Sequence, residues 1–317
     1  MELLGTGSYL PGQVLTNDEL SNLVDTSDDW IFQRTGIKER RLAKHETTSE
    51  MAVKAGHEAL KKAGVQAEEI DLIVLATVSP DCMIPSAACQ VQSEIGAFNA
   101  VAFDVNAACS GFIFALNTVY AYLKAGIYQI ALVIGTETFS NLLNWNDRKT
   151  CVLFGDGAGA VVLRNGDGLY HQVLHSNGSG GNVLTCGNRD RRNPLIQETS
   201  LEKYIKMDGK EVFKFAVSKV PECINELLQQ SKMEKEHIKY IVLHQANIRI
   251  IKSIAKRLEL PESKFPTNLE DYGNTSAASI PILLDEMNKK GLLRKKDRII
   301  LSGFGGGLTW GAILMEW

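Results

Sequence analysis

An internal duplication constrains the fold of this chain more than any other feature of its sequence. The segment EEIDLIVLAT, residues 68–77, aligns with EHIKYIVLHQ, residues 236–245. A second pair of segments, ALVIG ending at Gly135 and IILSG ending at Gly303, has the same offset of 168 residues. Self-similarity at one fixed spacing indicates a repeated structural unit. We therefore predict two halves built on the same plan, residues 1–165 and 166–317.

The segments between the repeats predict an α/β fold. The strands LIVLA and ALVIG are apolar on both faces, which is typical of sheets covered by helices on both sides. Residues 52–63 carry small apolar side chains at helical spacing, between a capping box at Thr47–Glu50 and a stop at Gly64. Residues 213–228 repeat this helical pattern in the second half. We expect five layers in the order α-β-α-β-α, with residues 183–206 as a surface insertion.

Composition excludes several classes of protein. The 317 residues are 44% hydrophobic and 22% charged, which is ordinary for a globular enzyme. A net charge of -3 gives no reason to expect nucleic acid or a membrane as a partner. No apolar run approaches the ~20 residues of a membrane helix, and residues 1–11 lack the basic start of a secretion signal. Six cysteines without a Cys-x-x-Cys pair indicate reduced thiols and a cytoplasmic protein.

Cys109 is the candidate nucleophile. It lies in DVNAACSGF, residues 104–112, where an extended segment meets an apolar helix. Backbone N–H groups and the helix dipole at such a turn lower the pKa of a thiol, so we expect a reactive thiolate. A buried structural cysteine explains the same pattern equally well as long as no catalytic partners are identified.

The candidate partners come from the second half. His244 ends the strand that duplicates LIVLAT, where the first half has Ala76, and such a break in a strand pattern often marks a site. Asn274 lies in YGNTSAAS, a turn that leads into a helix, where it could equally act as a cap. The run Gly305–Gly307 could donate a backbone N–H to an oxyanion, or could simply form a tight turn.

Four motifs together resemble one family. DVNAACSGF, HQANIR, YGNTSAA and GFGGGLTWGA, in this order and spacing, are similar to those of β-ketoacyl-acyl-carrier-protein synthase III, the initiating condensing enzyme of bacterial fatty acid synthesis. The likeness runs from TSDDWIFQRTGIKER to Trp310. The duplicated five-layer thiolase-like fold of that family agrees with the duplication found above.

The resemblance implies a mechanism. Cys109 would take an acyl group from acyl-CoA, either acetyl-CoA or a short branched acyl-CoA, and malonyl-acyl carrier protein would then enter. Decarboxylation would give an enolate held by His244 Nε2 and the Asn274 side-chain N–H, and its carbon would attack the acyl group to give a 3-ketoacyl carrier protein. Two neutral donors suit an enolate because they stabilise its charge without readily supplying a proton. The backbone N–H groups of Cys109 and Gly305 would form an oxyanion hole, and no metal or redox cofactor is implied.

The resemblance also implies binding residues, each of which could instead be ordinary surface or core. The family positions for the CoA nucleotide and its pantetheine tunnel are Thr26, Trp30, Arg34, Arg148, Gly209, Phe213, Ala246 and Asn247. Position 210 is Lys where some members have Asn. A basic helix face that suits an acidic carrier protein comprises Lys214, Arg249, Lys252, Lys256 and Arg257.

For the acyl pocket, the resemblance implies Thr77, Ile84, Leu142 and Phe304. Ile84 occupies a position that reaches across a homodimer into the partner's pocket, where some members have Phe. The smaller side chain predicts room for branched or longer primers.

Other functions remain possible from the sequence. A related thiolase-fold acyltransferase or a ketide or quinolone synthase would use the same scaffold, and a non-catalytic acyl-binding subunit would share the fold. A degradative or biosynthetic thiolase shares the fold but would need a second catalytic cysteine in the last Gly-rich loop, and no cysteine follows Cys223. The Gly-rich segments GTGSYL and GDGAGA do not fit a dinucleotide fingerprint.

Overall fold

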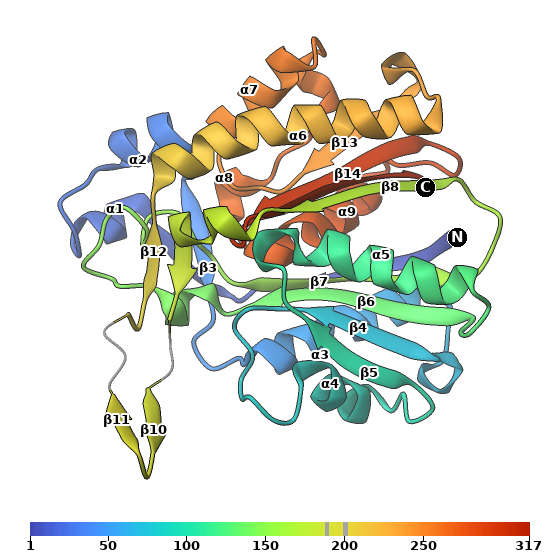
Figure 1. Cartoon of the computed structure of the whole chain (residues 1–317), viewed down its shortest axis with the longest axis horizontal. Coiled ribbons are helices and arrows are strands. Elements are labelled where there is room, and N and C mark those ends of the chain that lie inside the picture. The colour runs from blue at the N-terminus through green and yellow to red at the C-terminus, as the bar shows by residue number, and fades with distance from the viewer. Residues whose placement is uncertain (188–189, 199–201) are drawn as a thin grey trace.

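Two mixed sheets form the centre of the protein (Figure 1). The computed structural model describes residues 1–187, 190–198 and 202–317. The first sheet has the order β1 (Glu2–Tyr9), β7 (Gly157–Arg164), β6 (Ile130–Glu137), β4 (Leu72–Ala76) and β5 (Val101–Val105). The second has the order β13 (Tyr240–Leu243), β14 (Arg298–Gly305), β15 (Thr309–Glu316) and β8 (Tyr170–Ser176). Strand β4 pairs in parallel with β5 and β6, and β13 pairs in parallel with β14.

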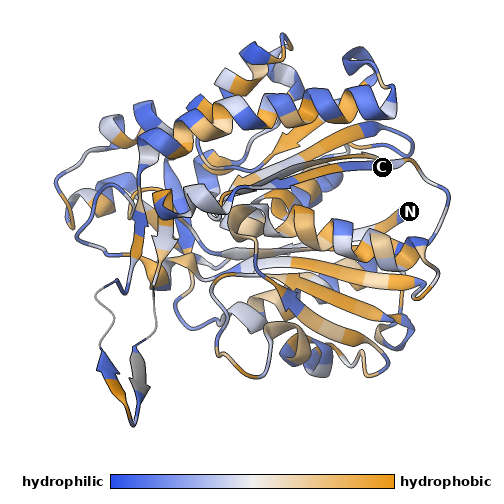
Figure 2. Cartoon of the chain, viewed as in Figure 1, coloured by the Kyte–Doolittle hydropathy of each residue, from blue (hydrophilic) through white to orange (hydrophobic). Residues whose placement is uncertain are grey.

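Helices separate and cover the two sheets, giving the five layers predicted from the sequence (Figure 1). Helices α3 (Thr48–Ala63) and α4 (Ala87–Ile95) pack on the outer face of the first sheet. Helices α5 (Gly111–Lys124) and α9 (Ser279–Lys289) lie between the sheets and contact both. Helix α6 (Gly209–Ser231) covers the outer face of the second sheet, with α7 (Ile248–Arg257) beside it. Figure 2 shows that the strands are largely hydrophobic and that the outer helices are hydrophilic on their exposed sides.

The duplication appears element by element at the offset of 168 residues. Strand β13 follows β4 at this offset, β14 follows β6, and α9 follows α5. Two short turns obey it as well, namely η2 (Ala108–Ser110) and η7 (Ser276–Ala278), which pack against each other. Within them Ala108 and Ser276 share an unusual backbone, with φ of 47° and 50°. The boundary predicted at residue 165 falls between β7 and β8, and it stays a prediction.

Helix α3 illustrates how local sequence produces the packing. The predicted capping box forms between Thr47 and Glu50, and Gly64 ends the helix in the left-handed conformation at φ 65°. The inner face of α3 is buried and carries mostly small side chains such as Ala55 and Ala59. Strand β1 can therefore lie so close to α3 that a Cβ atom on Gly5 would collide with the helix backbone.

The smaller elements surround the two sheets. They are β2 (Gln13–Thr16), α1 (Asn17–Ser21), α2 (Asp28–Thr35), β3 (Glu39–Leu42), η1 (Ala67–Glu69), η3 (Phe139–Leu142), η4 (Gly178–Val183), η5 (Lys235–His237), η6 (Glu262–Lys264) and α8 (Leu269–Tyr272). The insertion predicted at 183–206 contains the pair β9 (Leu184–Cys186) and β12 (Ile205–Met207), and the pair β10 (Arg191–Asn193) and β11 (Ile196–Glu198), which projects from the body (Figure 1). Residues 188–189 and 199–201 of this stretch lie outside the described residues.

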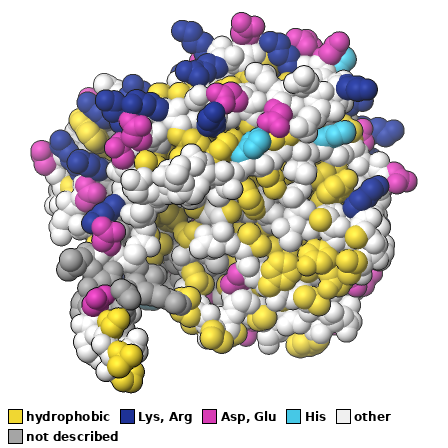
Figure 3. All heavy atoms as spheres, in the orientation of Figure 1, with side chains coloured by type: hydrophobic (Ala, Val, Ile, Leu, Met, Phe, Trp, Pro, Cys, Tyr) yellow, Lys and Arg dark blue, Asp and Glu magenta, His cyan; other side chains and the backbone are white. Residues whose placement is uncertain are grey.

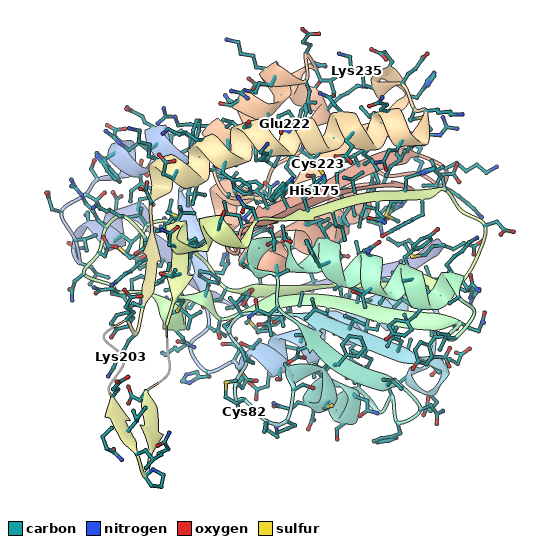
Figure 4. All side chains as sticks on the ribbon, viewed as in Figure 1. Cys82, His175, Lys203, Glu222, Cys223 and Lys235 are labelled. Carbon is teal, nitrogen blue, oxygen red and sulfur yellow. The ribbon has the colours of Figure 1, made fainter. Side chains whose placement is uncertain are left out.

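All six cysteines are unpaired, as expected from the sequence. Cys82, in the loop before α4, and Cys223, on α6, lie in different halves of the molecule (Figure 4). Among the helices of the described residues, none combines the length and the apolar character needed to cross a membrane.

Candidate active site

Residues from both halves meet in one cavity of about 620 Å³. Cys109, His244, Asn274, Phe304 and Gly305 all line it. Cys109 lies in the turn before α5, His244 directly follows β13, and Asn274 precedes η7. The three residues selected separately from the sequence therefore surround a single space.

The thiol of Cys109 is buried, with only 5% of the residue exposed. Burial raises its pKa to about 12, helped by the charge of Glu137, while the nearby Ser276 side chain acts in the opposite direction as a hydrogen-bond partner. The lowered pKa predicted from the sequence is wrong, because the loss of solvent around the sulfur outweighs the backbone dipoles of the turn. The resting thiol is thus protonated, and attack on a thioester requires a group that accepts its proton.

The Gly-rich loop after β14 lies against the nucleophile. A Cβ atom on Gly305 would lie 2.6 Å from the backbone nitrogen of Cys109, closer than real Cβ atoms approach. Glycine is therefore required at this position by contact rather than by turn geometry alone. The two residues predicted to form an oxyanion hole are in direct proximity.

Hydrogen bonds hold both the backbone and the ring of His244 in place. Its backbone N–H donates to Ser302 O at 2.9 Å, and its ring Nδ1 lies 2.7 Å from Ser279 Oγ. The ring packs edge-on against Phe304, with centroids 5.2 Å apart. Burial lowers the pKa of His244 to about 3, so the ring is neutral at physiological pH.

Hydrogen bonds also fix Asn274. Its backbone N–H donates to Leu153 O at 2.8 Å, and its backbone oxygen accepts from the Gly155 N–H at 3.0 Å. The side-chain Oδ1 accepts from the backbone N–H of Ser276 at 2.8 Å. With Oδ1 engaged, the Nδ2 amino group is the remaining polar end of this side chain.

Sequence reasoning missed a buried carboxyl group beside these residues. Glu137, at the end of β6, is fully buried and accepts hydrogen bonds from Thr77 Oγ1, the Val78 N–H, Ser79 Oγ and Ser276 Oγ. Burial raises its pKa to about 7, against the effect of these donors. A signal was present, because a glutamate that closes the apolar strand ALVIGTE breaks the strand pattern as His244 does. Ser279, the partner of His244, was missed as well.

The residues predicted to bind CoA fall into two groups. Arg34, Gly209, Phe213, Ala246 and Asn247 line the cavity. The others, Thr26, Trp30 and Arg148, lie outside the cavity lining.

Trp30 is at the centre of that outer group. The guanidinium carbons of Arg34 and Arg148 lie 4.5 Å and 5.1 Å from its ring centroid. Arg148 also donates to the backbone oxygen of Asp25 at 2.6 Å. Thr26 Oγ1 is buried and has no hydrogen-bond partner among the described residues.

The predicted basic face is continuous with the cavity. Lys214 and Arg249 line the cavity, whereas Lys252, Lys256 and Arg257 are exposed on α7. Figure 3 shows Lys and Arg side chains gathered around α2 and the N-terminal part of α6. Lys149 and Lys210 add further positive charge to the lining, and no sequence pattern had selected Lys149.

The residues predicted for the acyl pocket do not form one wall. Phe304 lines the cavity, but Thr77 and Leu142 lie outside its lining. The Thr77 hydroxyl donates to Glu137, and Leu142 packs in a small cluster that includes Phe154. Ile84 is 88% exposed. Among the described residues there is also no group of three or more His, Cys, Asp or Glu side chains arranged to hold a metal ion.

Comparisons with known proteins decide the family. A family model described as 3-oxoacyl-[acyl-carrier-protein] synthase III matches residues 103–178, and the corresponding C-terminal model matches residues 228–317. A β-ketoacyl-[acyl-carrier-protein] synthase III of Clostridium acetobutylicum is 52% identical, with 100% of this chain and 98% of the relative covered. This chain belongs to the β-ketoacyl-acyl-carrier-protein synthase III family. The synthase III crystal structure from Aquifex aeolicus VF5 matches with a TM-score of 0.94 at 45% identity, covering 100% of this chain and 99% of that one.

Family membership confirms the thiolase-like fold and makes this synthase III homologue a condensing acyltransferase. A synthase III structure from Thermus thermophilus gives the same TM-score of 0.94 at 40% identity, with 100% of this chain and 99% of that chain covered. A priming β-ketosynthase of the R1128 polyketide pathway matches less closely in sequence, at 34% identity and TM-score 0.93, covering 99% of this chain and 95% of that one. The comparisons therefore do not favour a secondary-metabolism synthase or a non-catalytic subunit.

Proposed function

We propose that this synthase III homologue transfers an acyl primer from acyl-CoA to Cys109 and condenses it with malonyl-acyl carrier protein. The products are 3-ketoacyl-acyl carrier protein, CoA and CO2, and the reaction starts fatty acid synthesis. The observation that carries this proposal is that Cys109, His244, Asn274 and Gly305 line one cavity although they come from both halves.

The first half-reaction is acyl transfer. The Cys109 thiolate attacks the thioester carbonyl of acyl-CoA, and the negative charge that develops on oxygen is held by the backbone N–H groups of Cys109 and Gly305. The close approach of Gly305 to Cys109 supports this oxyanion hole. The CoA sulfur then leaves with a proton, and the acyl group stays on Cys109.

The second half-reaction is decarboxylative condensation. The Ser279 hydroxyl lies 2.7 Å from His244 Nδ1, and in the tautomer that this step requires it donates to Nδ1 while the ring proton lies on Nε2. His244 Nε2–H and Asn274 Nδ2–H then hold the oxygen of the enolate that malonyl carrier protein forms as it loses CO2. The enolate carbon attacks the acyl-Cys109 carbonyl, the carbon–sulfur bond breaks, and Cys109 is released. The low pKa of His244 supports a neutral donor in this step.

The CoA nucleotide is assigned to the group around Trp30. Its adenine is sandwiched between the indole ring and an arginine, while guanidinium groups meet the phosphates. Arg148 now lies over the ring and must move aside before a base can stack on that face. The unsatisfied Thr26 Oγ1 provides a polar contact for the same ligand.

The carrier protein is assigned to the basic face of α7 and the adjoining cavity mouth. Lys252, Lys256 and Arg257 are exposed there, which suits an acidic partner. These steps need no metal or redox cofactor. The reaction takes place in the cytoplasm, where acyl-CoA and carrier protein are soluble.

We further propose a homodimer. Strand β5 is at the edge of its sheet, and Val101 on it is 48% exposed. Met83 and Ile84 in the preceding loop are 61% and 88% exposed. Figure 3 shows hydrophobic side chains gathered over α5 and the neighbouring β4–β5 region. Pairing through this face would bury them, and Ile84 would then reach the partner's acyl pocket.

Reconstitution tests this function. Purified protein is incubated with acetyl-CoA or isobutyryl-CoA and malonyl-acyl carrier protein, and the carrier is analysed by mass spectrometry. We expect a 3-ketoacyl carrier protein whose formation requires Cys109. Acylation of Cys109 without condensation on the carrier would favour a related thiolase-fold acyltransferase instead.

A further inference from the structure

The two carboxyl oxygens of Glu137 have different surroundings. Oε2 accepts three hydrogen bonds from the segment that follows β4, namely from Thr77 Oγ1 at 3.1 Å, the Val78 N–H at 3.0 Å and Ser79 Oγ at 2.6 Å. Oε1 accepts from Ser276 Oγ at 3.0 Å. One oxygen thus holds the carboxyl group in place, and the other faces a hydroxyl that belongs to the second half of the protein.

Ser276 connects this carboxyl group with the nucleophile. The turn η7, which carries Ser276, packs against η2, which carries Cys109, and the Ser276 side chain acts to lower the pKa of the Cys109 thiol as a hydrogen-bond partner. A serine hydroxyl has one proton to donate, so it can donate to Glu137 or to the sulfur, but not fully to both. Its position is fixed, because the Ser276 N–H donates to Asn274 Oδ1 at 2.8 Å and η7 packs against η2.

Three groups could accept the Cys109 proton, and charge distinguishes them. Release to solvent would leave two negative charges, on the sulfur and on Glu137, in a buried site. Transfer to His244 would create a cation on a buried ring whose Nδ1 faces the Ser279 hydroxyl rather than a carboxylate. Transfer to Glu137 leaves the net charge of the site unchanged and removes the carboxylate charge that opposes the thiolate. The pKa values agree, since that of Glu137 is about 7 and that of His244 about 3.

We propose that Glu137 accepts the proton of Cys109 through the hydroxyl of Ser276. The S–H proton passes to Ser276 Oγ while the Ser276 O–H proton passes to Glu137 Oε1. The products are a thiolate, an intact hydroxyl and a carboxylic acid, and the total number of protons is unchanged. The Ser276 hydroxyl, now free of the carboxylate, donates to the thiolate. Glu137 thus acts on the nucleophile through Ser276, as a positioning residue, and this role rests on the proposed function of Cys109.

The other groups around Glu137 leave this pair isolated. The segment after β4 donates three hydrogen bonds to Glu137, from two hydroxyls and a backbone N–H, and η7 donates one from a hydroxyl. Within the described part of the chain, the hydrogen-bond partners of Glu137 are hydroxyls and a backbone N–H rather than Lys, Arg or His. The charge of Glu137 raises the pKa of Cys109.

The rate of Cys109 alkylation by iodoacetamide, followed by intact-protein mass spectrometry as a function of pH, tests this coupling. Once Glu137 is ionised, the resting form and the proton-transferred form contain equal numbers of protons, so their ratio no longer depends on pH. The wild-type rate should therefore rise with pH and flatten above about pH 7, until direct release of the Cys109 proton to solvent takes over at higher pH. In Glu137→Gln the thiolate forms only by releasing its proton, so the rate should keep rising by about tenfold per pH unit.

Three further variants make the test specific. Asp156→Asn removes another buried carboxylate, one that bonds to Ser140 and the Ala43 N–H instead, and should keep the levelling. Ser276→Ala should lower the plateau by about tenfold, because the thiolate loses a donor, and keep the inflection. His244→Ala should also keep the inflection near pH 7.

A wild-type rate that never levels off, or a Glu137→Gln profile that still does, would overturn the proposal. Levelling that disappears in His244→Ala but not in Glu137→Gln would make His244 the acceptor. If Glu137→Gln does not fold, the His244→Ala profile still separates the two acceptors, because loss of the levelling in that variant would overturn the proposal and its retention supports Glu137. Iodoacetamide involves neither acyl-CoA nor carrier protein, so a failure of the proposed function would be seen separately.

Discussion

Gly305 and Cys109 approach each other so closely that a Cβ atom on Gly305 would lie 2.6 Å from the backbone nitrogen of Cys109. They come from opposite halves of a duplicated chain, one from the end of β14 and the other from the turn before α5. The contact joins the nucleophile to the second half. It also explains why a Gly-rich loop, rather than any other turn, closes this side of the cavity.

Gly305→Ala should therefore abolish most acyl transfer. The methyl group has no space, so the loop must shift and the donor predicted at this position moves away from the oxyanion. We expect the single-turnover acylation rate to fall on the order of 10²–10³-fold, the usual cost of losing one such donor. Gly306→Ala is the matched control, because its Cβ would meet the backbone oxygen of Leu184 at 3.3 Å and the side chain at 3.4 Å, so that a shift of a few tenths of an ångström suffices. Equal losses in both variants would contradict the role of Gly305.

His244 should stay neutral in the folded protein well below its ordinary pKa. Nuclear magnetic resonance of isotope-labelled histidine, assigned with a His244→Ala variant, should report a neutral ring protonated at Nε2 from about pH 8 to pH 5. A ring that gains a proton near pH 6.5 would contradict this.

The same shift has a consequence for stability. The unfolded chain protonates this histidine near pH 6.5 and the folded chain only near pH 3, so stability is lost as the pH falls below 6.5. Thermal unfolding should be less acid-sensitive in His244→Asn than in the wild type. An identical pH dependence of the two unfolding midpoints would argue against a buried neutral ring.

Ser279→Ala should separate the two half-reactions. Loss of the Ser279 hydroxyl leaves Nδ1 without its partner, so the ring no longer favours the tautomer with the proton on Nε2. Malonyl decarboxylation should fall by about tenfold, as expected for one buried hydrogen bond, while acylation of Cys109 changes little. Parallel losses in both half-reactions would indicate a general structural defect.

Trp30→Ala should raise the KM for acyl-CoA by about tenfold and leave kcat largely unchanged, because stacking of a base on an aromatic ring contributes about 1–3 kcal/mol. Phe32→Ala, on the same helix and 39% exposed, is the control and should have little effect. If both variants behave alike, the nucleotide binds elsewhere.

Lys256→Glu should weaken use of malonyl-acyl carrier protein without affecting acylation by acetyl-CoA, since Lys256 is exposed on α7 outside the cavity lining. The effect should shrink at high salt, because the contact is electrostatic. Lys61→Glu reverses an equivalent exposed charge on α3, in the opposite outer layer, and should change neither step. A loss confined to the acyl-CoA step would reject the docking face.

The architecture could be predicted from the sequence because the two copies of the repeat keep similar apolar segments at a constant offset of 168 residues. The alignment of residues 68–77 with 236–245 became β4 and β13 at the same offset. His244 could be found because it breaks a strand pattern, and Cys109 because it begins a helix. Each of these signals is local in the chain.

The remaining features depend on contacts that no local pattern encodes. The pKa of Cys109 is set by burial between the two halves, so the helix-dipole argument gave the wrong direction. Glu137 gains its role from Ser276, which lies 139 positions further along the chain. The hydrogen bond from the Thr77 hydroxyl to Glu137 could not be predicted either, and the place of Thr77 in the acyl pocket stays a prediction. Burial and long-range hydrogen bonding decide all three.

The most direct test of the account is intact-protein mass spectrometry after incubation with a panel of acyl-CoAs. We predict a mass increase of one acyl group, located by peptide mapping on Cys109, which is absent in Cys109→Ala. An adduct on another residue, or wild-type labelling of the Cys109→Ala variant, would contradict the central claim that the residues around this cavity form one acyl-transfer site.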